Sequence, residues 1–177
     1  MKSVSIRPAC PADVPALTLL WREMWDYHSR LDPRFAASPV ADQAMAEWLR
    51  AGAVNPDGCL LVAEADGLPI GYVHALVLEN SPAVLPRRYG LLSEIAVTAA
   101  ARRAGVGTQL LEAAHRWLAA KGVEAVEVNV GALNPASRAF WRKHGYGGFV
   151  ERYRREFQGE RGKEKGENGG ACGPDSR

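Results

Sequence analysis

The sequence lacks several features that mark common classes of protein. Its 177 residues contain only three cysteines, an odd number without the spacing of a metal site, so we expect reduced thiols, no bound metal and a cytoplasmic protein. No apolar run approaches the roughly 20 residues that a membrane-spanning helix requires, and the first residues show no signal-peptide core. We therefore expect no membrane partner.

The sequence also has little net charge and no internal repeat. The net charge is +2 and the basic residues form no single block, so we expect no nucleic-acid partner. Hydrophobic residues make up 47% of the chain, enough for the core of one domain, which we place at residues 1–157. Residues 158–177 are almost free of apolar side chains and predict a disordered polar tail.

What is present predicts strands and helices in alternation, and so an α/β fold. Helices should begin near Pro11, Val40, Gly105 and Asn134. Asp66 and Gly67 form a strong hairpin turn signal between two apolar runs. We expect strands at residues 3–7, 59–64, 70–78, 92–97, 125–130, 146–151 and 152–157.

The most informative stretch joins the strand at 92–97 to a basic turn that opens a helix. The turn contains Arg102, Arg103, Gly105 and Gly107. At the start of a helix the first amides have no partner and the dipole is positive, so backbone alone can bind an anion. Glycine lacks a Cβ atom and lets a diphosphate approach the main chain closely. The stretch therefore predicts a phosphate-binding turn.

Other interpretations of this turn are weaker. A Walker A loop requires a lysine after its last glycine, and Thr108 follows Gly107 here. A dinucleotide-binding loop requires a third glycine or alanine where this chain has Leu110, although Glu127 lies near the expected acidic position. The two glycines would also be compatible with a turn that binds nothing.

The motif Arg102-x-x-Gly105-x-Gly107, following residues 94–97 and followed by the segment 134–146, resembles the acetyl-CoA site of the GCN5-related N-acetyltransferase (GNAT) family. The resemblance covers about residues 4–157. It implies a mixed, splayed central sheet of about seven strands flanked by about four helices. It also implies contacts of acetyl-CoA with Ile95, Ala96, Val97, Arg102, Arg103, Ala104, Gly105, Val106, Gly107, Thr108, Asn134, Ser137 and Trp141.

The implied activity is direct transfer of the acetyl group of acetyl-CoA to a primary amine of a small molecule or peptide. A lysine-like amine is neutral in only ~0.04% of molecules at pH 7, so a base is useful. Glu94 is a carboxylate in an otherwise apolar strand, and the resemblance implies that it is the general base. A structural salt bridge to Arg or Lys is the alternative. The resemblance also implies that a main-chain amide near Val97 polarises the acetyl carbonyl.

The sequence departs from the family at Trp141, where many relatives have a tyrosine that protonates the departing thiolate. Tyr146, Tyr89 or water would have to replace it, and we take Tyr146 as the candidate acid. A thiol pKa near 8.5 makes the thiolate a tolerable leaving group even without an acid. The departure also leaves open a non-catalytic acyl-CoA-binding or regulatory module.

The amine acceptor is the least defined partner. The best candidates for acceptor contact are Tyr27 and His28, although His28 would also fit as a hydrogen-bonded residue at the edge of the core. Dimerisation is an expectation at the level of the family. Acidic residues that either line an acceptor mouth or form a solvated helical face are Glu23, Asp26, Asp32, Asp42 and Glu47.

Overall fold

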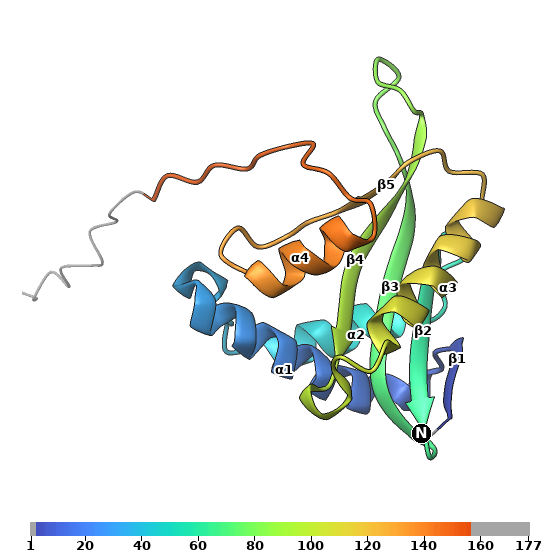
Figure 1. Ribbon diagram of the computed structural model, residues 1–177, viewed down its shortest axis with the longest axis vertical. Helices are drawn as coiled ribbons and strands as arrows, with labels where there is room; N and C mark the ends of the chain where they lie inside the picture. The colour runs from blue at the N-terminus through green and yellow to red at the C-terminus, as the bar shows by residue number, and fades with distance from the viewer. Residues whose placement is uncertain (1–2, 157–177) are drawn as a thin grey trace, which may run out of the picture.

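A mixed five-stranded sheet forms the centre of the molecule, which the computed structural model describes from residue 3 to residue 156 (Figure 1). Its strands lie side by side in chain order, with β1 to β4 antiparallel and β5 parallel to β4. The strands are β1 (Val4–Pro8), β2 (Gly58–Ala65), β3 (Leu68–Glu79), β4 (Arg88–Val97) and β5 (Val126–Val128).

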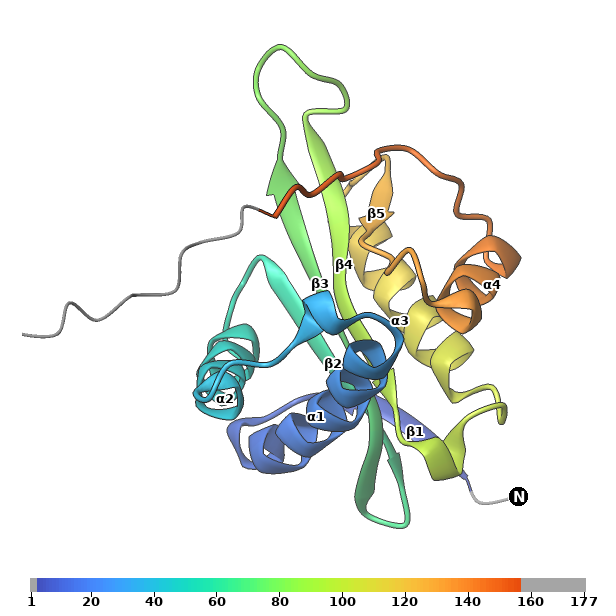
Figure 2. The same cartoon turned by 90° about the vertical axis from the view of Figure 1, so that its left-hand side faces the viewer.

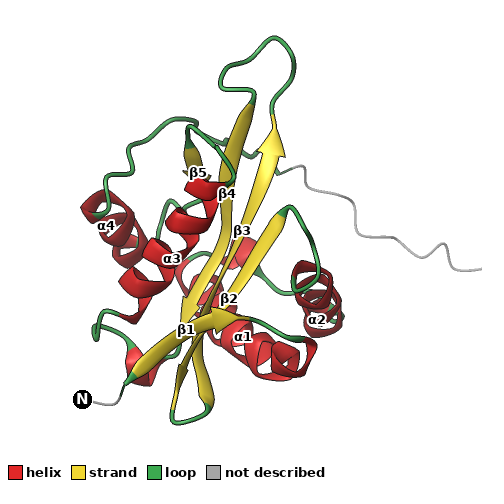
Figure 3. Cartoon of the chain, turned by 90° about the vertical axis from the view of Figure 1, so that its right-hand side faces the viewer, coloured by secondary structure: helices red, strands yellow, loops and turns green. Residues whose placement is uncertain are grey.

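Helices cover both faces of the sheet (Figures 2 and 3). α1 (Val14–Leu31) and α2 (Ala41–Gly52) lie on one side, which we call the α1 face. α3 (Val106–Ala120) covers the other side, the α3 face, and α4 (Pro135–Lys143) packs beside α3. Short 3-10 helices at Pro11–Asp13, Pro33–Phe35 and Ala99–Ala101 complete the connections. No helix in the described part of the chain is long and apolar enough to cross a membrane.

The central strands are apolar on both sides, so each face of the sheet has its own hydrophobic core. On the α3 face, Val73 and Leu92 pack with Leu110 and its neighbours on α3. On the α1 face, Tyr72 packs with Trp21 and other residues of α1 and α2. Burial on both faces explains why these strands are nearly continuous apolar runs in the sequence.

Local signals predicted the ends of several elements. Asp66 and Gly67 both have positive φ, as a type I′ hairpin turn requires. The Asn134 side chain caps α4 by accepting a hydrogen bond from the Ser137 amide. Gly145, with a φ of 86°, directly follows His144 at the C-terminal end of the same helix. The predicted helices and the hairpin are confirmed.

A bulge interrupts the pairing of β3 with β4. His74 pairs with Glu94 and Ala75 pairs with Leu92, so Ser93 is an extra residue without a partner on β3. Leu92 points to the α3 face, whereas Ala96, two residues beyond Glu94, packs on the α1 face. The bulge therefore separates Leu92 and Glu94, which a regular alternation would place on one face.

The expected count of about seven strands is wrong. The strand predicted at 125–130 is reduced to three residues, and residues 146–156 contain neither strand nor helix. They leave α4 in an irregular, extended path that does not join the sheet (Figures 1 and 2). Alternating residues form a strand only where a partner edge receives them, and the sequence does not reveal that edge. Residue 157 and the predicted tail 158–177 lie outside the described residues.

Candidate active site

Glu94 lies on β4 with its side chain half-buried on the α1 face. The hydroxyl of Tyr72 donates a hydrogen bond to Glu94 Oε2 at 2.7 Å. Burial raises the pKa of Glu94 to about 7, and the Tyr72 hydrogen bond opposes that rise. Tyr72 is itself fully buried, and burial together with the adjacent carboxylate holds its pKa well above the usual range. Between residues 3 and 156 no Arg or Lys pairs with Glu94, so the alternative of a structural salt bridge is not realised.

The strand that carries Glu94 has a free edge next to it. β5 pairs with β4 only from Gly90 to Leu92, and beyond that point the two chains separate. The amide of Thr98 donates to a carbonyl of β3, so strand alternation turns the amides of Ile95 and Val97 the other way, toward the gap. The gap between β4 and β5 therefore exposes main-chain donors within three residues of Glu94.

The turn after β4 has the backbone shape that an anion-binding loop requires. Arg103 and Gly105 have φ values of 65° and 83°, in the left-handed region. Gly105 is the N-cap of α3, so the amides of residues 106–108 have no partner within the helix. A Cβ atom on Gly107 would lie 3.5 Å from the ring of Phe140, an ordinary contact. These amides and the positive end of α3 face outward from the turn together.

Arg102 is fixed between this turn and α1. Its Nη2 donates to Glu23 Oε1 at 2.7 Å, and its Nε donates to the carbonyl of Val97 at 3.0 Å. The guanidinium group lies over the ring of Tyr27, 5.9 Å from its centroid. The structure thus brings the predicted phosphate contact Arg102 next to the predicted acceptor contact Tyr27.

Glu23 also secures the start of the turn, because it accepts hydrogen bonds from the Thr98 hydroxyl at 3.0 Å and the Ala99 amide at 2.7 Å. The Glu23 carboxylate therefore has partners within the protein and is not a free charge for an acceptor. Three more of the acidic residues considered for an acceptor mouth have partners: Asp32 with Arg34, Asp42 with Arg22, and Glu47 with Gln43. These contacts favour the interpretation that the carboxylates stabilise the helical surface over the interpretation that they line an acceptor site.

His28 connects α1 to the start of α4. Its Nδ1 lies 3.0 Å from the carbonyl of Met24, so this nitrogen must carry the proton. Its Nε2 is then free to accept from the Asn134 side-chain amide, 3.2 Å away. The predicted acceptor contact His28 and the predicted acetyl-CoA contact Asn134 therefore touch one another. Ser137 lies beside them, with its amide bonded to the oxygen of Asn134 at 2.9 Å.

Trp141 is a core residue. Its side chain is only 5% exposed and packs in the core of the α3 face. The indole nitrogen donates to the hydroxyl of Ser137 at 3.1 Å. Trp141 therefore supports the α4 segment from within, and its indole has no proton to give at neutral pH.

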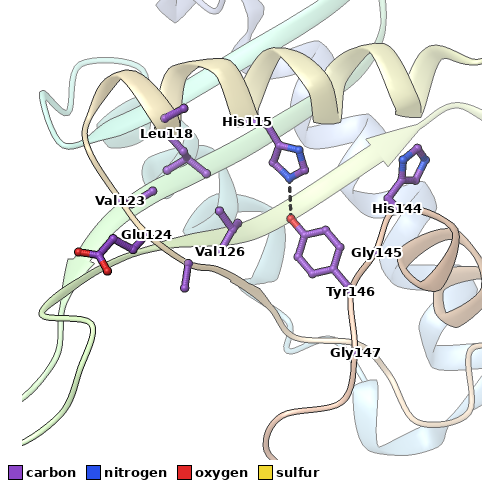
Figure 4. A pocket seen from close by; sticks show the side chains of 11 residues that line it. His115, Leu118, Val123, Glu124, Val126, His144, Gly145, Tyr146 and Gly147 are labelled. Carbon is purple, nitrogen blue, oxygen red and sulfur yellow. Dashed lines mark hydrogen bonds between the residues drawn. The ribbon is translucent and has the colours of Figure 1, made fainter.

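Tyr146 lies beside α3, at a hollow shown in Figure 4. Its hydroxyl forms a hydrogen bond of 2.7 Å with His115 Nε2. Burial raises the pKa of Tyr146 to about 12. Tyr146 packs against the core of the α3 face, whereas the Tyr72 that holds Glu94 belongs to the core of the α1 face. The structure thus does not bring the two predicted catalytic residues together.

Sequence reasoning missed Tyr72 and the role of Glu23. Tyr72 reaches Glu94 from the neighbouring strand, and only the pairing register around the bulge at Ser93 shows this. Glu23 reaches the turn at Arg102 from a position 79 residues earlier. No local pattern marks either contact.

Comparison with known proteins agrees with this geometry. The model of the acetyltransferase (GNAT) family matches residues 18–146, most of the chain. The chain belongs to the GNAT family. The uncharacterised N-acetyltransferase YhfO of Bacillus subtilis (strain 168) is 25% identical over 143 residues, which cover 81% of this chain and 89% of YhfO.

Solved structures show the same GNAT fold. A mutant of the BH1408 protein from Bacillus halodurans has a TM-score of 0.79 at 18% identity, covering 86% of this chain and 99% of that one. The aminoglycoside N-acetyltransferase AAC(6')-Iy in complex with CoA has a TM-score of 0.69 at 21% identity, covering 89% and 97%. A predicted acetyltransferase with acetyl-CoA from Clostridium acetobutylicum has a TM-score of 0.71 at 13% identity, covering 87% and 96%.

Proposed function

We propose that this chain is an N-acetyltransferase that moves an acetyl group directly from acetyl-CoA to a primary amine of a small molecule or peptide. The observation that carries the proposal is the half-buried carboxyl group of Glu94, with its pKa raised to about 7, beside the free amides of β4 and close in sequence to the turn at residues 102–108. Family membership supports acetyl transfer, and solved relatives with CoA and acetyl-CoA support the donor.

Glu94 is suited to the role of general base. With a pKa of about 7, it is partly ionised at neutral pH and can take a proton from an ammonium group, directly or through water. Burial makes its carboxylate a stronger base than an exposed one. The hydrogen bond from Tyr72 fixes one carboxylate oxygen and leaves the other available.

The free edge of β4 would bind the acetyl donor. The amides of Ile95 and Val97 can donate to the pantetheine arm and to the acetyl carbonyl, where negative charge develops. The turn at residues 102–108 would hold the diphosphate through its free amides. Asn134 and Ser137 begin α4 on the other side of the gap. Trp141 would contribute by supporting that helix from the core.

The acceptor amine would approach past the C-terminal half of α1. Tyr27 lies against Arg102, and His28 lies against Asn134, so both flank the segments proposed to bind acetyl-CoA. The departing thiol has a pKa near 8.5 and needs little assistance. Tyr146 stays the candidate acid, but a pKa of about 12 makes it a weak one at neutral pH.

The test measures release of the CoA thiol from acetyl-CoA with a panel of simple monoamines, amino-acid amides, polyamines and aminoglycosides. The last class is included because an aminoglycoside N-acetyltransferase shares the fold. We expect release that requires both an amine and Glu94, with Glu79→Gln, a change at the exposed end of β3, as the control. Tight binding of acetyl-CoA without release for any amine would favour the non-catalytic acyl-CoA-binding module instead.

A further inference from the structure

Glu23 of α1 is the side chain on which three groups of the connection between β4 and α3 converge. Its carboxylate accepts hydrogen bonds from the Thr98 hydroxyl at 3.0 Å, the Ala99 amide at 2.7 Å and Arg102 Nη2 at 2.7 Å. α1 lies beside this connection (Figures 1 and 2). One carboxylate from another part of the chain therefore holds both ends of the segment 98–102.

The contact with Ala99 completes a helix cap. Ala99 is the first residue of the 3-10 helix Ala99–Ala101, and the side chain of its N-cap Thr98 does not cap it. The first amides of a helix have no partner within it. A hydrogen bond from such an amide to a carboxylate is roughly twice as strong as one between neutral groups. Glu23 thus supplies from α1 the cap that the segment does not supply for itself.

Arg102 is engaged on three sides in this arrangement. Besides its bond to Glu23, its Nε donates to the Val97 carbonyl at 3.0 Å and its guanidinium lies over the ring of Tyr27. The Thr98 amide donates to β3, so the Val97 carbonyl of the same trans peptide unit points the other way, toward the gap between β4 and β5. Arg102 therefore covers an oxygen that would otherwise present negative partial charge to an anionic ligand.

The neighbouring Arg103 is in a different situation. Its side chain is exposed and forms no hydrogen bond or ion pair with the residues from 3 to 156. The pair of Glu23 and Arg102 has no net charge, so Arg102 adds little attraction for a diphosphate. The groups left to attract it are Arg103, the free amides of residues 106–108 and the positive end of α3.

We propose that Glu23 is a positioning residue for acetyl-CoA. It holds the segment 98–102 in the shape that leaves the amides of residues 106–108 free for the diphosphate, and Arg102 is the structural cation of this arrangement, not a ligand of the diphosphate. The inference rests on the proposed function, because it concerns the same acetyl-CoA site. It differs from the resemblance, which counts Arg102 among the contacts of acetyl-CoA.

The two roles of Arg102 predict effects of opposite sign when the Glu23 carboxylate is removed. If Glu23 competed with the diphosphate for Arg102, Glu23→Ala would free a cation, remove a negative charge and tighten binding. If Glu23 positions the turn, binding weakens, because the turn has its binding shape for less of the time. We expect the Kd for acetyl-CoA to rise by about tenfold, as for a turn that keeps this shape about a tenth of the time.

The first test is calorimetric titration of the full chain with acetyl-CoA. Glu23→Gln keeps an oxygen for the Ala99 amide but loses the ion pair with Arg102, so its Kd should lie between those of wild type and Glu23→Ala. The matched control is Glu64→Ala, because Glu64 is also a partly exposed carboxylate that accepts from an arginine, Arg7 Nε at 2.8 Å, but lies on β2. The control should keep the affinity of the wild type.

Steady-state kinetics separate positioning from a general loss of structure. Glu23→Ala should raise the KM for acetyl-CoA by about tenfold and change kcat by less than about threefold, because Glu94 is unaltered. A purely structural role would lower the melting temperature without this division between KM and kcat. Thermal unfolding and circular dichroism confirm that each variant is folded, and Glu23→Gln carries the test if Glu23→Ala is not.

A second test is a double-mutant cycle between Glu23 and Arg102. Arg102→Gln should weaken acetyl-CoA binding in the wild-type background and have little further effect in the Glu23→Ala background, because the arrangement that Arg102 serves is already lost. A side chain that binds the diphosphate directly would cost at least as large a factor in the second background as in the first.

The outcomes distinguish this proposal from the proposed function. A wild-type chain that does not bind acetyl-CoA would remove the proposed function, and this role with it. A wild-type chain that binds, with Glu23→Ala binding equally or more tightly, would overturn the positioning role alone. An undiminished effect of Arg102→Gln in the Glu23→Ala background would show that Arg102 contacts the diphosphate and would also overturn it.

Discussion

Glu94 is the residue at which burial and hydrogen bonding act in opposite directions. Burial favours its neutral form, and the Tyr72 hydroxyl favours its ionised form. The result is a pKa of about 7, where proton uptake and release are both accessible near neutral pH. This environment suits Glu94 to the proposed role of general base.

Replacing Glu94 by Gln keeps the shape of the side chain and removes proton acceptance. We expect kcat/KM to fall by roughly 10²–10⁴ at neutral pH, the usual contribution of a general base. The deficit should shrink at alkaline pH, where the amine is already partly neutral. A pH series of initial rates, with acetyl-CoA affinity as the control, checks this. Equal rates for variant and wild type across the series would remove Glu94 from the mechanism.

Replacing Tyr72 by Phe removes the hydrogen bond that favours the Glu94 carboxylate. The pKa of Glu94 should rise above about 7, because burial then acts without opposition. A hydrogen bond to a charged group contributes about 1.5–3 kcal/mol, so the acidic limb of the pH–rate profile should move up by roughly one to two units. A loss of rate that is uniform over pH would show that Tyr72 has only a packing role.

Among single residues, the role of Glu94 could be predicted from the sequence, whereas the contact of Tyr72 with Glu94 could not. A carboxylate within an apolar strand is anomalous wherever the strand is placed, so its chemistry can be inferred from residue type. The contact with Tyr72 depends on which residue of β3 faces which residue of β4, and the extra residue Ser93 changes that correspondence.

Among the elements, the turn between β4 and α3 has the most specific geometry. Glycine at position 105 permits its positive φ, and α3 then begins with its free amides outward. Glu23 of α1 holds the turn through Arg102, so the two elements are connected by an ion pair between exposed side chains. Such pairs contribute little to stability, and this one acts mainly on the position of the turn.

Gly107→Glu should weaken acetyl-CoA binding by about tenfold or more, because it places a negative charge where the diphosphate is proposed to bind. Gly107→Ala is the matched control. Its Cβ atom meets Phe140 at 3.5 Å, an ordinary contact, so the fold should be retained and the loss of affinity should be smaller than in the Glu variant, because no charge is added. Calorimetric titration with acetyl-CoA measures the affinity of each variant. An unchanged affinity in a folded Glu variant would show that the diphosphate binds elsewhere.

Elements with local signals were predicted well. Helix caps, the Asp66-Gly67 turn and the apolar runs depend on neighbouring residues alone. The segment at 146–156 was predicted as strand because its residues alternate, but a strand exists only with a partner, and the segment pairs with none of the described strands. The length of β5 could not be predicted for the same reason, because it depends on how far β4 pairs with it.

On the scale of the whole molecule, two groups with shifted pKa values make the stability of the fold depend on pH. His74 is almost fully buried, packs against Trp48, and has no hydrogen-bond partner among the described residues. Burial lowers its pKa from 6.5 to about 4. Between pH 6.5 and 4, His74 is therefore protonated in the unfolded chain and neutral in the folded one, so the free energy of unfolding decreases as pH falls through this range. Glu94 has the opposite effect, because its raised pKa makes stability fall as pH rises from 4.5 to 7.

His74→Leu should remove the acid-sensitive contribution. Relative to wild type, we expect the variant to gain about 2 kcal/mol of unfolding free energy at pH 5 compared with pH 7.5, from a pKa difference acting over about 1.5 pH units. Urea denaturation at the two pH values measures the difference. An equal effect of the substitution at both values would mean that His74 does not titrate between them.

The bulge on β4 makes the sheet less regular and helps to keep the gap between β4 and β5 open. Ser93 pairs with no residue of β3. Leu92 and Glu94, on either side of it, point to opposite faces of the sheet, as they would if Ser93 were removed and they were neighbours. Without Ser93, β4 would run straighter, and the bend that accompanies a bulge would be lost. β5 could then follow β4 further and cover the amides of Ile95 and Val97. We expect a chain shortened by this one residue to have a more regular sheet and to lack the opening in which acetyl-CoA is proposed to bind.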